Sequence, residues 1–356
     1  MRKLSVCVLF GGISPEHEVS LRSAESVLNH IDHSKYNIFP VGITKDGDWI
    51  LYGGTDYSKL PTGEWRSCPN NRRAAISPVR GQGLLSFEGD CVVRERIDVV
   101  FPVLHGENGE DGAMQGLLQM AGIPYVGPHV AASATAMDKT LTKLVVDSVG
   151  VPQAAWQLVR RGELDNRMEN TLGTLEFRFR YPMFVKPAGT GSSVGVSKAK
   201  DREGLRQALL KAAEYDEKIL VEEFIHGREI EVAVMGNGSP VASVCGEIDS
   251  GVEFYDYDAK YITDTSTAYI PARIPGDVEE VVREAAVKVY SAIGCQGLSR
   301  VDFFVTYDEN RVVFNEINTI PGFTSISMYP KLFEASGIPY SKLIDELIEL
   351  ALEACQ

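Results

Sequence analysis

Four polar side chains recur at two-residue spacing in two β-rich runs near the C-terminal end of the chain. Arg300 and Asp302 lie in "SRVDFFV", and Glu316 and Asn318 lie in "VVFNEIN". Because side chains at positions i and i+2 point to the same face of a strand, each pair shares a face. The turn-forming residues "DEN" between the runs predict a hairpin that brings all four side chains together.

The donor types on this predicted hairpin favour a magnesium ion. Two carboxylates and an amide oxygen beside an arginine match the protein ligands of Mg²⁺ where phosphate oxygens also bind the ion. Zinc would require histidine or cysteine ligands, and neither occurs in these two runs. For the hairpin taken alone, the alternative interpretation is a solvated polar face with a surface salt bridge.

A second candidate site is the small-residue loop "KPAGTGSSVG", residues 186–195. Between two strands, such a loop lets backbone N–H groups approach phosphate oxygens closely. It is not a Walker A motif, because Lys186 precedes the loop at the end of a strand and no GK[ST] opens a helix. Taken alone, the loop is a weak signal, because glycine-rich loops between strands are usually just flexible hairpins.

Three lysines complete a set of groups suited to phosphate chemistry. Lys139 lies in "MDK", Lys186 precedes the glycine-rich loop, and Lys260 lies in the aromatic stretch "EFYDYDAKY". Surface lysines are normally solvated, so each lysine taken alone is uninformative. Together with a magnesium-type hairpin and a glycine-rich loop, they predict phosphoryl transfer.

Three further segments are candidates for the site. "HGENGEDG" follows the strand-like "DVVFPVL", at the strand end where α/β sheets place ligands. "NTIPGFTS" turns sharply at Pro321-Gly322 and could present backbone N–H groups to an oxyanion, although Pro-Gly is also an ordinary turn. "EFYDYDAKY" is too polar for a core strand and too aromatic for a plain linker.

The elements that must position these residues begin with a doubly wound α/β pattern. "KLSVCVLFGG" predicts a strand and glycine turn, and "SPEHEVSLRSAESVLNHI" predicts a helix. "YNIFPVGIT" and "IDVVFPVLHG" predict further strands, and "GAMQGLLQMAG" predicts a helix that ends at Gly122. Beyond this region, strands and helices alternate through "YPMFVKP", "REGLRQALLKAAEY" and "KILVEEFI" to the C-terminal end.

Length and charge narrow the class of protein. A chain of 356 residues predicts two or three domains. The 35 basic against 49 acidic residues give a net charge of −14, which argues against nucleic acid or an anionic membrane as partner. The six scattered cysteines predict reduced thiols in a cytosolic protein. The short apolar N-terminal run predicts a strand, and we expect neither a signal peptide nor a membrane span.

Taken in order, these motifs resemble one family over essentially the whole chain, the D-alanine–D-alanine ligases of the ATP-grasp superfamily. The resemblance implies an α/β protein with an N-terminal Rossmann-like domain at residues 1–128 that binds D-alanine. A central ATP-grasp subdomain at 129–222 would carry the glycine-rich loop, and a C-terminal subdomain at 223–356 would carry a lid loop and the magnesium site. The resemblance is carried by "GGISPEHEVSL", "PVLHGENGEDGAMQG", "MDKTLTK", "FVKPAGTGSSVGVSK", "EFYDYDAKY", "GLSRVDFFV" and "FNEINTIPGFTS".

The implied reaction joins two D-alanines for peptidoglycan precursors, in two steps. ATP phosphorylates the carboxylate of the first D-alanine, and the amine of the second attacks the acyl phosphate. The resemblance implies ATP as a substrate and two Mg²⁺ ions, with Mn²⁺ as an alternative, and it leaves a monovalent cation open. It also implies a cytoplasmic homodimer.

The resemblance assigns the nucleotide site residue by residue. Lys139 and Lys186 would hold the α- and β-phosphates, and Glu222 would accept from the adenine amino group. Glu229 would bind the ribose hydroxyls, and Lys260 would reach the transferred phosphoryl group. The remaining positions are the covering loop, Ser192, Ser193 and Val194, and the segment beside the ring, Glu223, Phe224 and Ile225.

The resemblance also assigns the metal and oxyanion groups. Asp302, Glu316 and Asn318 would carry the two metal ions, with Glu316 between them. Arg300 and the Gly322 N–H would stabilise the tetrahedral oxyanion.

The remaining assignments concern the two amino acid substrates. Glu16 would hold the ammonium of the first substrate, with His105 nearby, and Ser327 and Met328 would contact the second. Tyr261 would join Ser192 and Glu16 in a triad, and "EFYDYDAKY" would close over the site as a lid that excludes water.

Three positions bear on the second substrate. Tyr261, Val194 and Met328 favour a D-alanine–D-alanine ligase over relatives that make D-alanyl-D-lactate or D-alanyl-D-serine. "GITKDGDWILYGG", "FPVLHGENGEDG", "GEIDSGVEFYDY" and "ARIP" also resemble D-serine ligases, so a ligase of the vancomycin-resistance type is the alternative.

Two other classes fit less well. A degenerate ATP-grasp regulator would be expected to lack Arg300 or a metal ligand, and all of these are present. A biotin-dependent carboxylase, or another carboxylate–amine ligase with the same fold, would not explain Glu16 or the tyrosines of "EFYDYDAKY".

Overall fold

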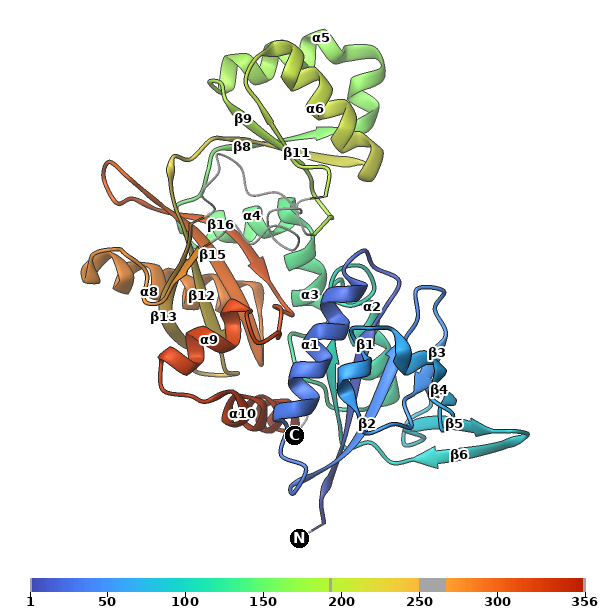
Figure 1. The fold of residues 1–356 in the computed structure, drawn as a ribbon. Helices are drawn as coiled ribbons and strands as arrows, with labels where there is room; N and C mark the ends of the chain where they lie inside the picture. The colour runs from blue at the N-terminus through green and yellow to red at the C-terminus, as the bar shows by residue number, and fades with distance from the viewer. Residues whose placement is uncertain (1, 192–193, 250–266, 355–356) are drawn as a thin grey trace.

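The computed structural model describes residues 2–191, 194–249 and 267–354, which form three β-sheets with helices packed on them (Figure 1). The first sheet has the order β6-β5-β4-β3-β2-β1-β7. β1 pairs in parallel with β2 and β7, whereas the other neighbours are antiparallel. Its strands are β1 (Leu4–Gly11), β2 (Tyr36–Ile43), β3 (Trp49–Leu51), β4 (Arg72–Ile76), β5 (Leu84–Glu88), β6 (Cys91–Glu95) and β7 (Val99–Val103).

The N-terminal sheet is buried on both faces, as the opening pattern of the sequence predicts. Along β1, Val6 and Val8 belong to one hydrophobic core, and Cys7 and Leu9 belong to another. Helix α1 (His17–His30) packs in the first core and α2 (Ala113–Ala121) in the second. α2 ends at Gly122, whose φ of 68° is the left-handed conformation that glycine adopts at helix ends.

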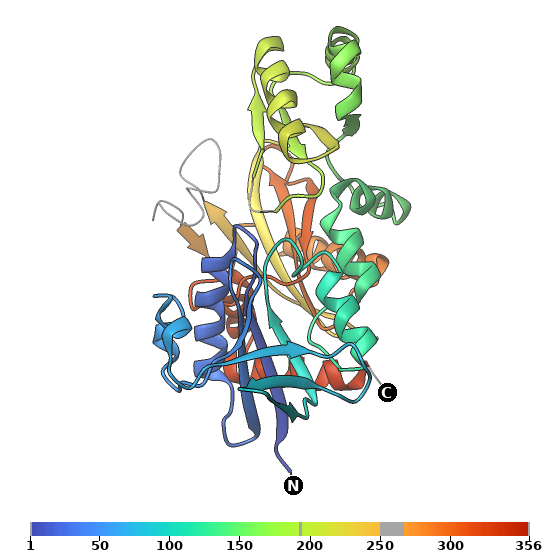
Figure 2. The same cartoon turned by 90° about the vertical axis from the view of Figure 1, so that its right-hand side faces the viewer.

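The second sheet is small and antiparallel, in the order β10-β9-β11-β8. Its strands are β8 (Trp156–Arg160), β9 (Met183–Pro187), β10 (Ser197–Ala199) and β11 (Lys218–Glu223). Helices α5 (Arg161–Arg178) and α6 (Arg202–Tyr215) share one core with this sheet. In Figures 1 and 2 this body stands apart at the top of the molecule.

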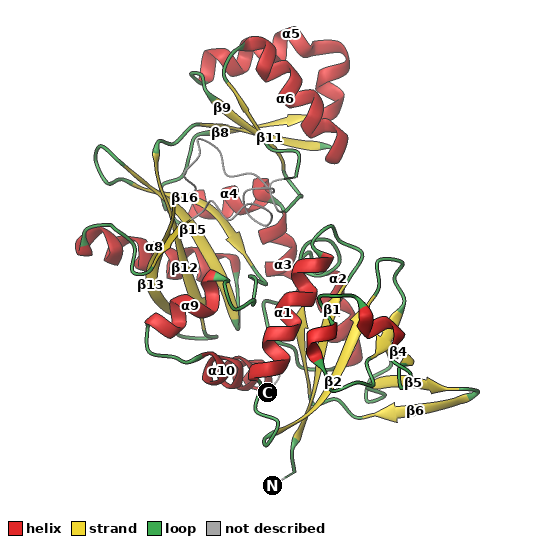
Figure 3. Ribbon diagram, in the orientation of Figure 1, coloured by secondary structure: helices red, strands yellow, loops and turns green. Residues whose placement is uncertain are grey.

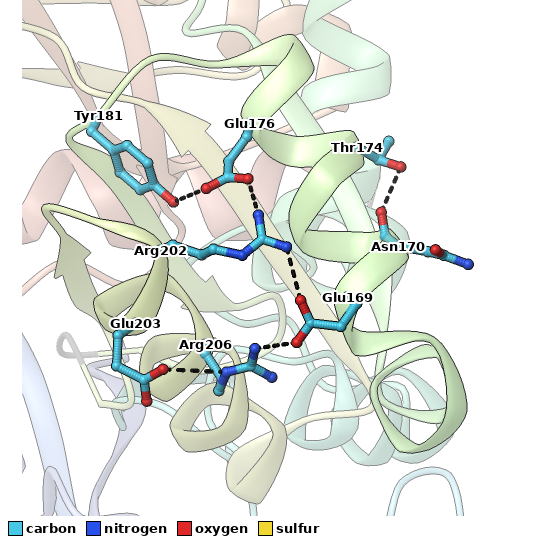
Figure 4. A network of polar contacts seen from close by, with 8 residues as sticks. All are labelled: Glu169, Asn170, Thr174, Glu176, Tyr181, Arg202, Glu203 and Arg206. Atoms are coloured by element: carbon cyan, nitrogen blue, oxygen red, sulfur yellow. Dashed lines mark hydrogen bonds and ion pairs between the residues drawn. The ribbon is translucent and has the colours of Figure 1, made fainter.

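A polar network joins α5 to α6 across the surface of the central body (Figure 4). Glu169 accepts hydrogen bonds from both Arg202 and Arg206, and Glu176 accepts from Arg202 and from the hydroxyl of Tyr181. The Glu169 side chain is 67% exposed, so solvent screens these pairs and each contributes little to stability. The apolar contacts between the helices and the sheet therefore hold this body together.

The third sheet is antiparallel, in the order β14-β13-β12-β15-β16 (Figure 3). Its strands are β12 (Gly227–Met235), β13 (Val241–Asp249), β14 (Thr267–Tyr269), β15 (Leu298–Thr306) and β16 (Val312–Asn318). One face shares a core with α3 (Val130–Met137), α4 (Lys139–Ser148) and α8 (Gly276–Ile293). The expected domain limits stay a prediction, and α3 and α4 pack with this third sheet.

The opposite face of the third sheet is joined to the N-terminal sheet through a common core. α9 (Met328–Ala335) contacts β12 and β13, and α10 (Tyr340–Glu353) contacts α1 and β7. A single cluster contains Val99 and Phe101 of β7, Tyr329 of α9, and Leu343 and Leu347 of α10. The N-terminal and C-terminal sheets thus belong to one packed body, against which the central sheet is a separate one.

Candidate active site

A cavity of about 450 Å³ lies between the central and C-terminal sheets. One wall comes from the end of β11 and the glycine-rich loop, and the other from β12, β13 and β16. Thr190 and Gly191 of the glycine-rich loop line it. So do nine of the residues that the sequence singles out for a site: Lys139, Lys186, Glu222, Glu223, Phe224, Ile225, Glu229, Glu316 and Asn318.

Glu222, which lines the cavity, is held between two lysines. The Nζ atoms of Lys143 and Lys186 each lie 2.5 Å from a different carboxylate oxygen of Glu222. All three side chains are buried. Burial alone would raise the pKa of Glu222, but the two ammonium charges outweigh it and lower that pKa to about 2. Glu222 is therefore an ionised hydrogen-bond acceptor in the wall of the cavity.

Sequence reasoning missed Lys143. It lies four residues after Lys139 in α4, so both lysines project from the same side of the helix. Lys143 is only 1% exposed, and its ammonium also approaches Gln153 Oε1 at 3.4 Å. The spacing in "MDKTLTK" could have suggested the pair, but only the tertiary packing brings Glu222 to it.

The N-terminus of α4 meets the start of the glycine-rich loop. The Asp138 side chain caps the helix by accepting from the N–H groups of Thr140 and Leu141. Lys139 then donates its backbone N–H to Ala188 O at 3.0 Å and its Nζ to Thr190 O at 2.6 Å. The two predicted phosphate-binding lysines, Lys139 and Lys186, therefore lie beside this loop.

The segment that leads from β11 to β12 forms an aromatic part of the cavity. Phe224 stacks on Phe184 with ring centroids 6.0 Å apart, and Lys198 Nζ lies 3.9 Å from the Phe224 centroid. Glu223 accepts from Ala155 N at 2.8 Å, which ties this segment to the chain before β8. A flat apolar surface next to the acceptor Glu222 suits a planar heteroaromatic ring.

The predicted hairpin is confirmed: β15 pairs antiparallel with β16, with Arg300 opposite Asn318 and Asp302 opposite Glu316. Val301, Phe303 and Val305 enter the core with α8, so the alternate residues face the other way. Arg300 donates two hydrogen bonds to Asp302, at 2.8 and 2.7 Å.

A third strand adds to this polar face. Asn318 Nδ2 donates to Asp302 at 3.0 Å, and Glu231 of β12 lies 3.2 Å from Arg300 Nε. Glu231 was also missed by sequence reasoning. It lies opposite Asp302 in the β12–β15 register, and the sequence gives no indication that these two strands are neighbours.

The oxygen donors of the hairpin fit a hard divalent cation. Asp302, Glu316 and Asn318 offer carboxylate and amide oxygens on one face, and Glu316 and Asn318 line the cavity. Within the residues that the structure describes, no three His, Cys, Asp and Glu side chains form a metal cluster. Magnesium takes about six oxygen ligands, so phosphate oxygens or waters would complete the coordination of an ion held by these three side chains.

Glu16 lies where the N-terminal domain meets the glycine-rich loop. A Cβ added at Gly106 would lie 2.8 Å from Glu16 Oε2, and one added at Gly191 would lie 3.3 Å from the same atom. The carboxylate thus sits between the loop after β7 and the glycine-rich loop. The predicted triad stays a prediction, because Ser192 and Tyr261 lie outside the described residues, as do Ser193, Lys260 and the whole of "EFYDYDAKY". Val194 is described, and its N–H donates to Gly191 O at 3.1 Å.

Gly322, Ser327 and Met328 lie together after β16. Ser327 precedes the first turn of α9, and its hydroxyl oxygen accepts from Thr324 N at 3.0 Å. A Cβ on Gly322 would lie 2.9 Å from Ser327 Oγ, so these two residues approach each other closely. Met328 begins α9 and is buried.

Glu110, in "HGENGEDG", is a further titratable group beside this turn. Its carboxylate accepts from Gly106 N at 2.8 Å and from Ile320 N at 3.2 Å. Desolvation, and then the charge of Glu16, raise the pKa of Glu110 to about 8.

Because the pKa of Glu110 is raised from 4.5 in the folded state, its contribution to stability is complete below pH 4.5 and is lost as the pH rises through 8. We expect Glu110→Gln to flatten the fall in melting temperature between pH 6 and pH 9, measured by thermal unfolding. The matched control is Glu107→Gln at an exposed position of the same loop. Parallel curves for wild type and Glu110→Gln would contradict the shift.

Two sheets closing on a cavity, joined to an N-terminal sheet with parallel strands, define the ATP-grasp class of fold. Family models described as "D-ala D-ala ligase N-terminus" and "D-ala D-ala ligase C-terminus" match residues 5–128 and 145–349. The chain therefore belongs to the D-alanine–D-alanine ligase family.

Individual relatives match over nearly the whole length. The D-alanine–D-alanine ligase of Acetivibrio thermocellus is 50% identical, with 99% of this chain and 96% of the relative covered. Among solved structures, the VanG D-Ala:D-Ser ligase of Enterococcus faecalis has a TM-score of 0.89 at 39% identity, covering 98% of this chain and 100% of that one. The D-alanine–D-alanine ligase of Coxiella burnetii has a TM-score of 0.87 at 37% identity, covering 100% and 96%. In the described part of the chain, no helix is both long and apolar enough to span a bilayer.

Proposed function

We propose that this protein joins two D-alanine molecules to D-alanyl-D-alanine at the expense of ATP, as a cytoplasmic homodimeric enzyme of peptidoglycan precursor synthesis. The observation that carries the proposal is the convergence of two kinds of group on one cavity. Lysines and an ionised glutamate occupy one wall, and the acidic hairpin with Glu316 and Asn318 occupies the other. Family membership supplies the identity of the substrate.

In the first step, ATP lies along the cavity. Glu222 accepts the adenine amino group beside Phe224, and Lys139 and Lys186 bind phosphate oxygens. A carboxylate oxygen of the first D-alanine, whose ammonium is held by Glu16, attacks the γ-phosphorus. The bond from that phosphorus to the bridging oxygen breaks, and ADP leaves. Asp302, Glu316 and Asn318 would hold two Mg²⁺ ions, which neutralise phosphate charge when bound.

In the second step, the amine of another D-alanine attacks the carbonyl carbon of the acyl phosphate. The carbonyl oxygen gains negative charge, which Arg300 and the Gly322 N–H stabilise. Loss of a proton from the amine and departure of phosphate complete the peptide bond. Arg300 is suited to this task because Asp302 and Glu231 already fix its guanidinium group in place.

A second candidate function is the joining of D-alanine to D-serine. It is favoured by the fold match to the VanG D-Ala:D-Ser ligase, whose TM-score is 0.89. The two activities differ only in how the second site treats a methyl group and a hydroxymethyl group, and a pocket fitted to a methyl rejects an added hydroxyl by only about a hundredfold.

A competition assay distinguishes the two. The protein is given ATP, Mg²⁺ and D-alanine together with an equal concentration of D-serine or D-lactate, and the products are identified by mass spectrometry. We expect D-alanyl-D-alanine to predominate in both mixtures. Predominance of D-alanyl-D-serine would establish the second candidate instead, and the absence of any ATP-dependent product would overturn both.

A further inference from the structure

The turn Ile320–Phe323 follows β16, but N-terminal residues hold its backbone. Glu110 accepts from Ile320 N, as described above, and His105 Nδ1 lies 3.0 Å from Ile320 O. Both side chains come from the loop after β7. The peptide groups on both sides of Ile320 are therefore fixed by the N-terminal domain.

The far end of the same turn is held by helix α1. Phe323 N donates to Ser23 Oγ at 3.2 Å, and Ser23 Oγ lies 3.3 Å from His105 Nε2. Ser23 and His105 are both buried, with 0% and 5% exposure. These contacts form a continuous relay that begins at Phe323, passes through Ser23 and His105, and ends at Ile320.

The hydrogen positions in this relay follow from the chemistry of the partners. A carbonyl oxygen only accepts, so His105 Nδ1 must carry the hydrogen that is shared with Ile320 O. Burial lowers the pKa of His105, so the ring is neutral and Nε2 is an acceptor. The Ser23 hydroxyl must then donate to Nε2, while its oxygen accepts from Phe323 N. Each group in the relay has one compatible role.

The relay encloses Pro321 and Gly322. Proline has no N–H group, and in the described part of the chain the Gly322 N–H donates to no other group. The relay and Glu110 thus satisfy the donors on either side and leave one donor, on a fixed backbone, for a ligand. The hydroxyl of Tyr340 also donates to Phe323 O, so the turn is hydrogen-bonded to α10 as well as to α1 and the loop after β7.

We propose that Ser23 and His105 are positioning residues that orient the Gly322 N–H toward the oxyanion of the second chemical step. The inference rests on the proposed function, because it needs the Gly322 N–H to meet the tetrahedral adduct. The family resemblance implies that His105 lies near the first substrate. In this structure both ring nitrogens of His105 are already hydrogen-bonded, Nδ1 to Ile320 O of the turn and Nε2 to Ser23 Oγ, so we assign it a positioning role instead.

The expected fall in kcat for Ser23→Ala can be estimated from the cost of losing an oxyanion donor altogether. Removing one oxyanion donor outright lowers kcat by about 10²–10³. Ser23→Ala leaves the donor in place but frees one end of its turn, so we expect kcat to fall about tenfold, with KM for ATP and D-alanine changed by less than about twofold. A phosphinate analogue of the tetrahedral adduct should lose affinity by the same factor as kcat.

The control is Ser243→Ala. Ser243 is a buried serine of β13 that accepts from Ala233 N at 3.0 Å, so its loss removes a comparable buried hydrogen bond that is not part of the relay. A second variant, Ser23→Cys, keeps the size of the side chain and weakens the hydrogen bonds, and it should give a smaller loss of kcat. Thermal unfolding of each variant measures the structural cost separately.

The outcomes separate the inference from the function it rests on. If wild type forms no dipeptide, the proposed function fails. If wild type is active but Ser23→Ala and Ser23→Cys retain full kcat and analogue affinity, the inference is overturned. It is also overturned if Ser243→Ala lowers kcat equally, or if the loss appears in KM alone. Combining Ser23→Ala with His105→Gln should lower kcat little beyond the larger single effect, because both variants break one relay.

Discussion

Glu316→Gln is expected to lower the rate of ATP-dependent dipeptide formation by about a thousandfold, because metal ions supply several kcal/mol of charge stabilisation in such reactions. The side chain lines the cavity and lies opposite Asp302 in the β15–β16 register. An amide in its place is neutral and binds a hard cation weakly. The melting temperature should change little, since the hairpin core lies on the other face of the sheet.

The measurement is phosphate release from ATP with D-alanine, together with Mn²⁺ binding followed by electron paramagnetic resonance in the presence of ADP. Both should fall in Glu316→Gln. The matched control is Glu309→Gln, an exposed glutamate in the turn of the same hairpin, for which neither should change. Substantial turnover with normal Mn²⁺ binding in Glu316→Gln would remove this residue from the metal site.

Glu222→Gln is expected to reduce the free energy of unfolding by about 3–5 kcal/mol, because it leaves two buried ammonium groups without a counter-charge. Each lysine lies 2.5 Å from one of its oxygens, so both lose a partner at once. Chemical denaturation at pH 7 measures the loss. The wild-type contribution is complete above pH 4.5 and is lost as the pH falls toward 2, since the pKa of Glu222 is lowered in the folded state.

Two further variants test whether the unpaired buried ammonium groups cause the loss of stability in Glu222→Gln. The double variant Lys143→Met/Glu222→Gln should recover part of the loss, because it removes one of the stranded charges. Glu169→Gln removes a glutamate that also joins two cations, Arg202 and Arg206, but on the surface (Figure 4). It should cost less than about 1 kcal/mol. Equal losses for Glu169→Gln and Glu222→Gln would show that burial does not set the effect.

Local patterns predicted the parts of the fold whose partners are near in sequence. The alternation in "SRVDFFV" and "VVFNEIN" was sufficient to place Arg300, Asp302, Glu316 and Asn318 on one face, because a short turn fixes the register of a hairpin. The strand and helix after Gly12 were equally readable from their periodicity.

Contacts between distant segments could not be predicted in this way. Lys143 and Glu222 are brought together by the packing of α4 near the end of β11, and Ser23 meets Phe323 across two domains. Nothing in the residues around either partner specifies the other. The family resemblance placed Glu222 at the adenine, but it assigned no role to Lys143.

The Glu222 ion pairs also have a mechanical consequence. Lys143 belongs to a helix packed on the large body, whereas Glu222 and Lys186 belong to the small central sheet. The chain connects the small sheet to the large body just before β8 and just after β11, and Glu222 lies at the second of these connections. The Lys143–Glu222 ion pair is thus a non-covalent cross-link between the two bodies, close to a point where the backbone also connects them.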